Sequence, residues 1–195
     1  MCKKVCGFTI IELLVTIGIS VILAAISIPN IMKWYKKDEF LKQTQEVMDT
    51  LYDARAAALS EKKCTNSDYS ETWLWDINNS AKEVRLVCKD SNNNYHFIKS
   101  FVLDDNVNLS NIEYKNNSGT WTAIATNTKN GIEFISSTDG NSKGWVGVSG
   151  LPSSFNIRKI KFTFEFPDNT SIKRTICFDR IAGFPSISST SNCND

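Results

Sequence analysis

The first long pattern in the chain is an apolar run over residues 8–32, which contains a single charged side chain, Glu12. As a helix, this run would be roughly 37 Å long at ~1.5 Å per residue. The hydrocarbon core of a membrane is ~30 Å thick, so the run is long enough to cross it. Gly18 and Pro29 lie inside the run and weaken a helix locally. The pattern therefore predicts a membrane-spanning helix with a kink near Pro29.

Residues 38–62 continue the helical pattern, with apolar side chains on one face only. These side chains recur at helical spacing and are Leu41, Met48, Leu51, Tyr52, Ala58 and Leu59. Between the two stretches, Trp34 and Tyr35 are residue types that favour a membrane interface. We therefore expect one helix from Phe8 to about Lys62, with an amphipathic second half that packs on the domain behind it.

After Cys64 the pattern changes to short β-like runs separated by polar, turn-rich segments. The expected strands are residues 73–77, 83–88, 96–103, 120–125, 131–135, 144–148, 157–166 and 171–178. This succession predicts an α+β fold, in which the long N-terminal helix packs on an antiparallel β-sheet or β-sandwich head.

The strand expected at residues 157–166 alternates apolar and polar side chains, which predicts burial of one face only. Pro167, Asp168 and Asn169 follow it and predict a hairpin turn into the last strand. Residues 185–195 are rich in serine and are expected to be loose, apart from Cys193.

Glu12 is the unusual feature of the apolar run. A carboxylate at the centre of a membrane helix costs about 3 kcal/mol, whereas each Ile, Leu, Val or Phe returns roughly 0.3–0.6 kcal/mol, so the helix inserts despite the charge. A secretory signal cleaved near Ala24, or a plain anchor, gives no reason for a carboxylate there. A lipoprotein would carry its cysteine after the run, whereas Cys2 and Cys6 precede it.

The residues around Glu12 resemble the class III signal of type IV prepilins and pseudopilins. Lys3 and Lys4 form a short basic leader that ends in Gly7, and Phe8 and Glu12 follow it. The resemblance implies that prepilin peptidase cuts between Gly7 and Phe8 and that the amine of Phe8 is then N-methylated. It also implies that Glu12 pairs with the Phe8 amine of a neighbouring subunit, which relieves the penalty of an unpaired carboxylate in lipid.

The implied organisation is a cleaved leader (1–7), a transmembrane and assembly helix (8–32), an amphipathic continuation (33–63) and a β-rich head (64–195). This layout resembles the GspH/FimT group of minor pilins and pseudopilins. It implies a single-pass protein of the bacterial inner membrane with its head in the periplasm, which later enters a pilus or pseudopilus. The implied partners are prepilin peptidase, the membrane and other pilins. Type IV pili, competence pili and type II secretion share this N-terminal chemistry.

Four cysteines follow the apolar run: Cys64, Cys88, Cys177 and Cys193. They form no C-x-x-C pair and the single histidine lies far from any cysteine cluster, which argues against zinc. Two disulfides in an oxidising compartment fit better than four buried thiols. Four cysteines allow three connectivities, of which we expect the sequence-local one, Cys64–Cys88 and Cys177–Cys193.

The chain carries no recognisable catalytic or nucleotide-binding motif. We therefore expect no enzymatic activity, no cofactor and no metal. Two loops, 90–94 and 139–142, alternate Asp and Asn as calcium loops do, but both lack ligands that such loops need, so polar turns are the expected structure.

A group of cations near the C-terminus raises an alternative function, DNA capture. FimT-like minor pilins of competence systems bind DNA through C-terminal arginines, and a filament-borne DNA receptor is the alternative that the resemblance implies. The contacts would come from Lys173, Arg174 and Arg180, together with Arg158, Lys159 and Lys161. A Gly-Arg pair expected near this point is missing, and a solvated strand face explains the cations equally well, so DNA binding is not expected.

Overall fold

The computed structural model describes residues 8–60, 62–64, 70–116, 119–124, 129–135, 144–148, 157–179, 185–190 and 193. Its single described helix, α1 (Ile10–Leu59), starts and ends close to the predicted bounds. The chain divides into two compact units, Met1–Asp38 and Glu39–Asp195. We call the second unit the head.

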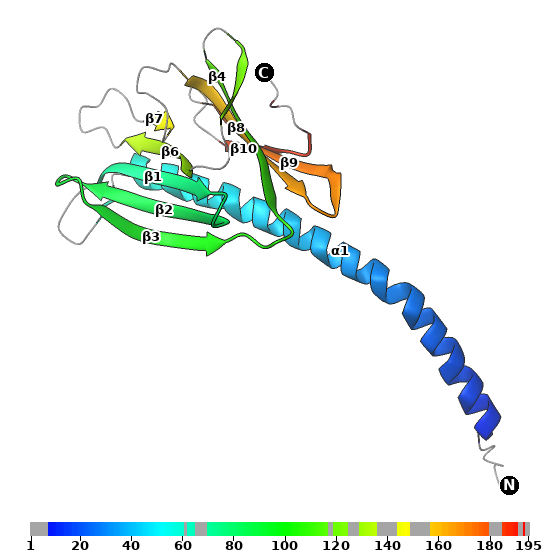
Figure 1. Ribbon diagram of the computed structural model, residues 1–195. Coiled ribbons are helices and arrows are strands. Elements are labelled where there is room, and N and C mark those ends of the chain that lie inside the picture. The colour runs from blue at the N-terminus through cyan, green and yellow to red at the C-terminus, as the bar shows by residue number, and fades with distance from the viewer. Residues whose placement is uncertain are drawn as a thin grey trace, which may run out of the picture. The chain divides into compact units, whose positions relative to one another are not determined.

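The head contains two five-stranded antiparallel sheets (Figure 1). The first, in the order β3-β2-β1-β6-β7, contains β1 (Ser70–Asn78), β2 (Glu83–Asp90), β3 (Tyr95–Val102), β6 (Lys129–Ile135) and β7 (Gly144–Val148). The second, in the order β10-β9-β8-β4-β5, contains β4 (Asn108–Asn116), β5 (Trp121–Ile124), β8 (Ile157–Phe166), β9 (Asn169–Asp179) and β10 (Pro185–Ser188). The α+β class predicted from the sequence is confirmed.

The core of the head forms where the second half of α1 meets both sheets. The buried side chains of α1 recur every three or four residues and are Phe40, Thr44, Val47, Thr50, Leu51, Ala54, Ala57 and Ala58. Three ring contacts tie the layers together: Phe40–Phe166 at 5.8 Å, Trp75–Phe162 at 5.0 Å and Phe134–Phe178 at 5.5 Å between centroids. The Thr50 hydroxyl also accepts a hydrogen bond of 3.1 Å from Trp75 Nε1, which satisfies this buried indole.

The strand β4 was missed by the sequence pattern because a β-bulge breaks its alternation. Its register with β8 shifts between Leu109 and Asn111, which makes Ser110 the extra residue. Leu109 and Ile112 are three residues apart and both are buried. A search for period-two alternation does not find such a strand, because a bulge changes which residues share a face.

Two expectations about the C-terminal part are wrong. Residues 185–188 are not loose, because they form β10 and pair with Thr175–Phe178 of β9, and the Tyr52 hydroxyl donates a 2.6 Å hydrogen bond to the Pro185 carbonyl. The strand β8 was expected to bury one face only, but it is buried on both faces. Its polar side chains Lys159, Lys161 and Thr163 are covered as well as its apolar ones. The predicted hairpin through Pro167 and Asp168 is present between β8 and β9.

Candidate functional site

The start of α1 has the geometry of a capped helix. Thr9 precedes the first helical residue, and its hydroxyl accepts a 3.3 Å hydrogen bond from the Glu12 backbone N–H. The Thr9 carbonyl accepts the first helical bond, from Leu13 N–H at 3.2 Å. Thr9 is therefore the N-cap and Glu12 is the third helical residue, the positions that a Ser/Thr-x-x-Glu capping box uses. The sequence Thr-Ile-Ile-Glu carries this signal, which the hydrophobic pattern alone does not reveal.

The first part of α1 presents a continuous apolar surface. Every side chain of residues 8–34 is exposed, including Phe8 and the Ile, Leu and Val side chains that follow it. Among the described residues, α1 is the one helix long and apolar enough to cross a membrane. A membrane or neighbouring helices can cover this surface, whereas water cannot do so favourably.

Three hydroxyl side chains in this apolar stretch are satisfied within the helix. The hydroxyls of Thr16, Ser20 and Ser27 donate hydrogen bonds of 2.7–2.8 Å to backbone carbonyls three or four residues earlier. These groups therefore need no partner outside the helix. The Glu12 carboxylate differs from them, because it brings a full charge into the same stretch.

The remaining N-terminal predictions are only partly described by the structure. Gly7 lies outside the described residues, while Phe8 lies just before the Thr9 cap. The helix continues through Gly18 and Pro29. A Cβ placed at Gly18 would meet no atom within 4 Å, so this glycine leaves open space on the helix surface. The kink that we expect at these two residues stays a prediction.

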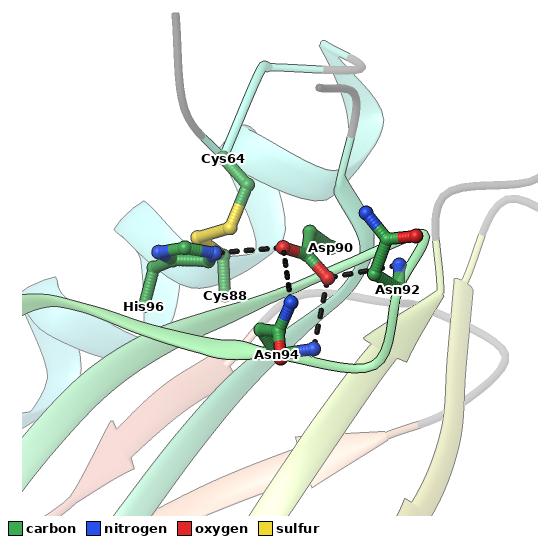
Figure 2. Close-up of a disulfide and its surroundings, with 6 residues drawn as sticks. All are labelled: Cys64, Cys88, Asp90, Asn92, Asn94 and His96. Carbon is green, nitrogen blue, oxygen red and sulfur yellow. Dashed lines mark hydrogen bonds and ion pairs between the residues drawn. A yellow bond between two sulfur atoms is a disulfide. The ribbon is translucent and has the colours of Figure 1, made fainter. Parts of the chain in front are cut away.

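In the head, Cys64 is bonded to Cys88 of β2, with 5.7 Å between the Cα atoms (Figure 2). This separation lies within the usual 4.4–6.8 Å range for disulfides. Cys64 follows the end of α1, so the bond fixes the end of the helix to the first sheet. Cys177 is bonded to Cys193 with a Cα separation of 5.8 Å. Both bonds are those of the sequence-local pairing.

The loop after Cys88 is organised by a buried carboxylate, Asp90. Its oxygens accept hydrogen bonds from the backbone N–H groups of Asn92 and Asn94 at 2.9 and 2.8 Å, and one lies 2.8 Å from His96 Nε2 (Figure 2). These contacts, with His96 first, lower the pKa of Asp90 to about 2. Both Asp90 oxygens are occupied by the loop's own donors, which favours a polar turn over a calcium loop. The second calcium-like loop, 139–142, lies outside the described residues.

Three of the six cations proposed as DNA contacts, the three lysines, are engaged with carboxylates. The ion pairs are Lys159 with Asp179 (3.6 Å), Lys161 with Glu113 (2.7 Å) and Lys173 with Glu165 (2.5 Å). Each pair joins residues that are direct partners across neighbouring strands. Lys161 Nζ also lies 4.4 Å from the ring centroid of Trp121, a cation–π distance. The expectation of a solvated strand face is therefore wrong for Lys159 and Lys161. Arg180 lies outside the described residues.

Sequence reasoning also missed a buried ion pair in the first sheet. Asp76 of β1 and Arg85 of β2 are direct cross-strand partners and form two hydrogen bonds of 2.7 and 2.8 Å. The hydrogen bond to Asp76 raises the pKa of Arg85 above its usual value. No sequence signal marks this pair, because only the strand register brings the two residues together.

A family model described as the prokaryotic N-terminal methylation motif matches residues 2–28. No curated protein and no solved structure matches the chain. The motif indicates a type IV pilin-like prepilin, a kind of chain that prepilin peptidase processes and that assembles with other pilins. The match ends within the apolar part of α1, so the role of the head has to be argued from its own residues.

Proposed function

We propose that the chain is a minor pilin or pseudopilin whose work is filament assembly. Prepilin peptidase cuts between Gly7 and Phe8, the Phe8 amine is N-methylated, and the apolar part of α1 then packs with the helices of other subunits. The observation that carries the proposal is the methylation motif at residues 2–28, which overlaps an apolar helical surface that no other described part of the chain covers.

The head fits this proposal as a module of the GspH/FimT type. Its two antiparallel sheets pack on the second half of α1, and its two disulfides suit an oxidising compartment. The helix is anchored in the inner membrane before assembly, with the head in the periplasm. The two units Met1–Asp38 and Glu39–Asp195 separate an assembly segment from a head that presents surface to other molecules.

Glu12 has two possible roles, which a pair of substitutions separates. As the third helical residue it can complete the cap of α1, and as a charge it can pair with the Phe8 amine of a neighbouring subunit. Glu12→Gln keeps a side chain suited to a capping box and removes the charge. Glu12→Val removes both properties. Thr9→Ser, which retains the capping hydroxyl, is the matched control.

The experiment measures processing and the amount of each variant in sheared filaments. We expect both Glu12 variants to insert and be cut, because neither brings a charge into the lipid and Glu12→Val removes an insertion penalty of about 3 kcal/mol. Both should be lost from filaments, while Thr9→Ser assembles normally. Normal incorporation of Glu12→Gln would show that capping alone accounts for Glu12 and would refute the charge-pair mechanism.

The alternative, a DNA receptor, has less support from the head. A DNA-binding surface needs several cations that are available to phosphates. The three candidate lysines instead lie in cross-strand ion pairs. Loss of Lys3 and Lys4 with the leader would also change the formal charge from +1 to −1. Assembly is therefore the function that we propose.

A further inference from the structure

The described edges of the two sheets differ in how they are protected. In the second sheet the edge strands β5 and β10 have four residues each. The strand β10 also begins with a proline, whose carbonyl is bonded by the Tyr52 hydroxyl. Short length and proline are two ways by which proteins prevent pairing at a sheet edge. In the first sheet, β3 lies at one edge (Figure 1). This strand has eight residues and contains no proline.

The strand β3 carries large apolar side chains on the face of the sheet turned away from the core. Tyr95, Phe97 and Val102 are 64%, 62% and 69% exposed. Their cross-strand partners in β2 are Lys89, Val87 and Glu83, which lie between the buried positions of that strand. Because paired residues share a face of the sheet, all three side chains lie on the outer face. Three such side chains on an edge strand form an apolar row beside backbone groups that no described strand pairs with, an arrangement that natural sheets usually avoid.

The opposite side of β3 borders a cleft of about 440 Å³. Ile98 and Lys99 of β3 line this cleft. Ile98 is the extra residue of a β-bulge, because Leu86 pairs with Lys99 and the next residue, Val87, pairs with Phe97. The last turns of α1, with Leu86 and Trp73, form much of the remaining wall, and Lys62, Lys99 and Asp53 contribute charged groups. The cleft volume falls within the range of ordinary ligand pockets.

We propose that β3 binds an extended peptide segment of another protein, which adds a strand to the first sheet. An unpaired strand edge recognises an extended backbone through its N–H and C=O groups. Successive side chains of an added strand point to opposite faces. One set of its side chains would lie over Tyr95 and Phe97, and an alternate side chain would enter the cleft beside Ile98.

The segment that fits is apolar at alternate positions and carries a carboxylate near Lys99. Among the described residues that line the cleft, two lysines against one aspartate give an excess of positive charge. The bulge at Ile98 limits regular pairing to a few residues on either side, which suits a short segment better than a long sheet. This proposal concerns the head alone and stands whether or not the chain assembles into a filament.

The test uses full-length protein in nanodiscs and a phage-displayed library of random dodecapeptides as the probe. The selected consensus peptide is then synthesised, and its affinity is measured by fluorescence anisotropy. Phe97→Lys places a charge on the apolar row, and Ile98→Asp places one at the cleft. The matched control is Thr122→Lys, at an exposed position of the protected edge strand β5. Because Phe97 and Ile98 are exposed, both test variants should fold, which tryptophan fluorescence checks.

We expect the selected peptides to alternate apolar residues and to include an acidic one. Phe97→Lys and Ile98→Asp should each weaken binding by about tenfold or more, the loss typical of a central interface residue. Thr122→Lys should leave the affinity unchanged. Failure to select such peptides, or equal binding to Phe97→Lys and wild type, would overturn the proposal. Self-association of the wild-type chain that Phe97→Lys abolishes would assign the edge to a second copy and would also overturn it.

Discussion

Two ion pairs, one within the first sheet and one between its flanking loops, have similar distances but differ in burial. They therefore show how burial changes the contribution of an ion pair to the stability of the head. Asp76 and Arg85 are 2.7 Å apart, and their side chains are 6% and 23% exposed. Lys82 and Asp105 are 2.9 Å apart, but their side chains are 34% and 100% exposed. We predict that Asp76→Asn destabilises the head strongly and that Asp105→Asn has little effect.

The expected loss in the free energy of unfolding follows from the surroundings of the Asp76 and Arg85 charges. At 2.7 Å and an effective dielectric constant of about 20, the attraction between Asp76 and Arg85 is about 6 kcal/mol before desolvation is subtracted. Breaking a buried pair typically costs about 3–5 kcal/mol, because one charge is left without a partner. Arg85 keeps some contact with water, so we expect a loss of about 2–3 kcal/mol in the free energy of unfolding. Solvent screens the Lys82–Asp105 pair and removes most of its attraction.

The assay is urea unfolding of the full chain in detergent, monitored by tryptophan fluorescence. Trp73 and Trp75 are buried on the same strand as Asp76, so their emission reports this sheet. A double-mutant cycle with Arg85→Gln isolates the pairwise energy. Equal destabilisation by Asp76→Asn and Asp105→Asn, or a coupling energy near zero between Asp76 and Arg85, would refute the reasoning.

Three further predictions concern the head. Gly131→Ala should destabilise it by about 1–3 kcal/mol in urea unfolding, because an added Cβ would collide with a neighbouring backbone carbonyl of β1. Asp90 has a pKa lowered from 3.8 to about 2 in the folded state, so its contribution to stability is present above pH 3.8 and is lost as the pH falls through 2. Melting temperatures across this pH range should therefore decline more in wild type than in Asp90→Asn. Non-reducing peptide mapping should find Cys177 joined to Cys193, and replacing both by serine should cost about 3 kcal/mol, because their loop spans 16 residues.

The fold class was predictable because its signals are local. The apolar run and the spacing of residues such as Leu51 and Ala58 predicted α1, and the bounds of β7 and β8 agree with the sequence pattern. The strand β4 was not predictable from alternation, since the bulge at Ser110 changes its period. The strand β10 has a composition typical of loops, and it forms because β9 and the Tyr52 hydroxyl hold it in place.

The electrostatics of the head were less predictable than its fold. Lys161 is solvent-facing by residue type, yet it is buried against Glu113 and Trp121. Such a position depends on strand register, which pairs residues far apart in the sequence. The Thr9 cap is the opposite case, because the Thr-x-x-Glu pattern around Glu12 was visible in the sequence from the start.

The most direct test of the assembly proposal is the mass and N-terminal sequence of the chain extracted from membranes of a host with prepilin peptidase. The proposal predicts a mature chain that begins at Phe8 with a methylated amine, because it assigns the processing signal to Gly7, Phe8 and Glu12, which lie within the matched motif. A chain that begins at Ser27 or Ile28 would show cleavage by signal peptidase, and an uncut Gly7–Phe8 bond would show a plain membrane anchor. Either result would contradict the proposal.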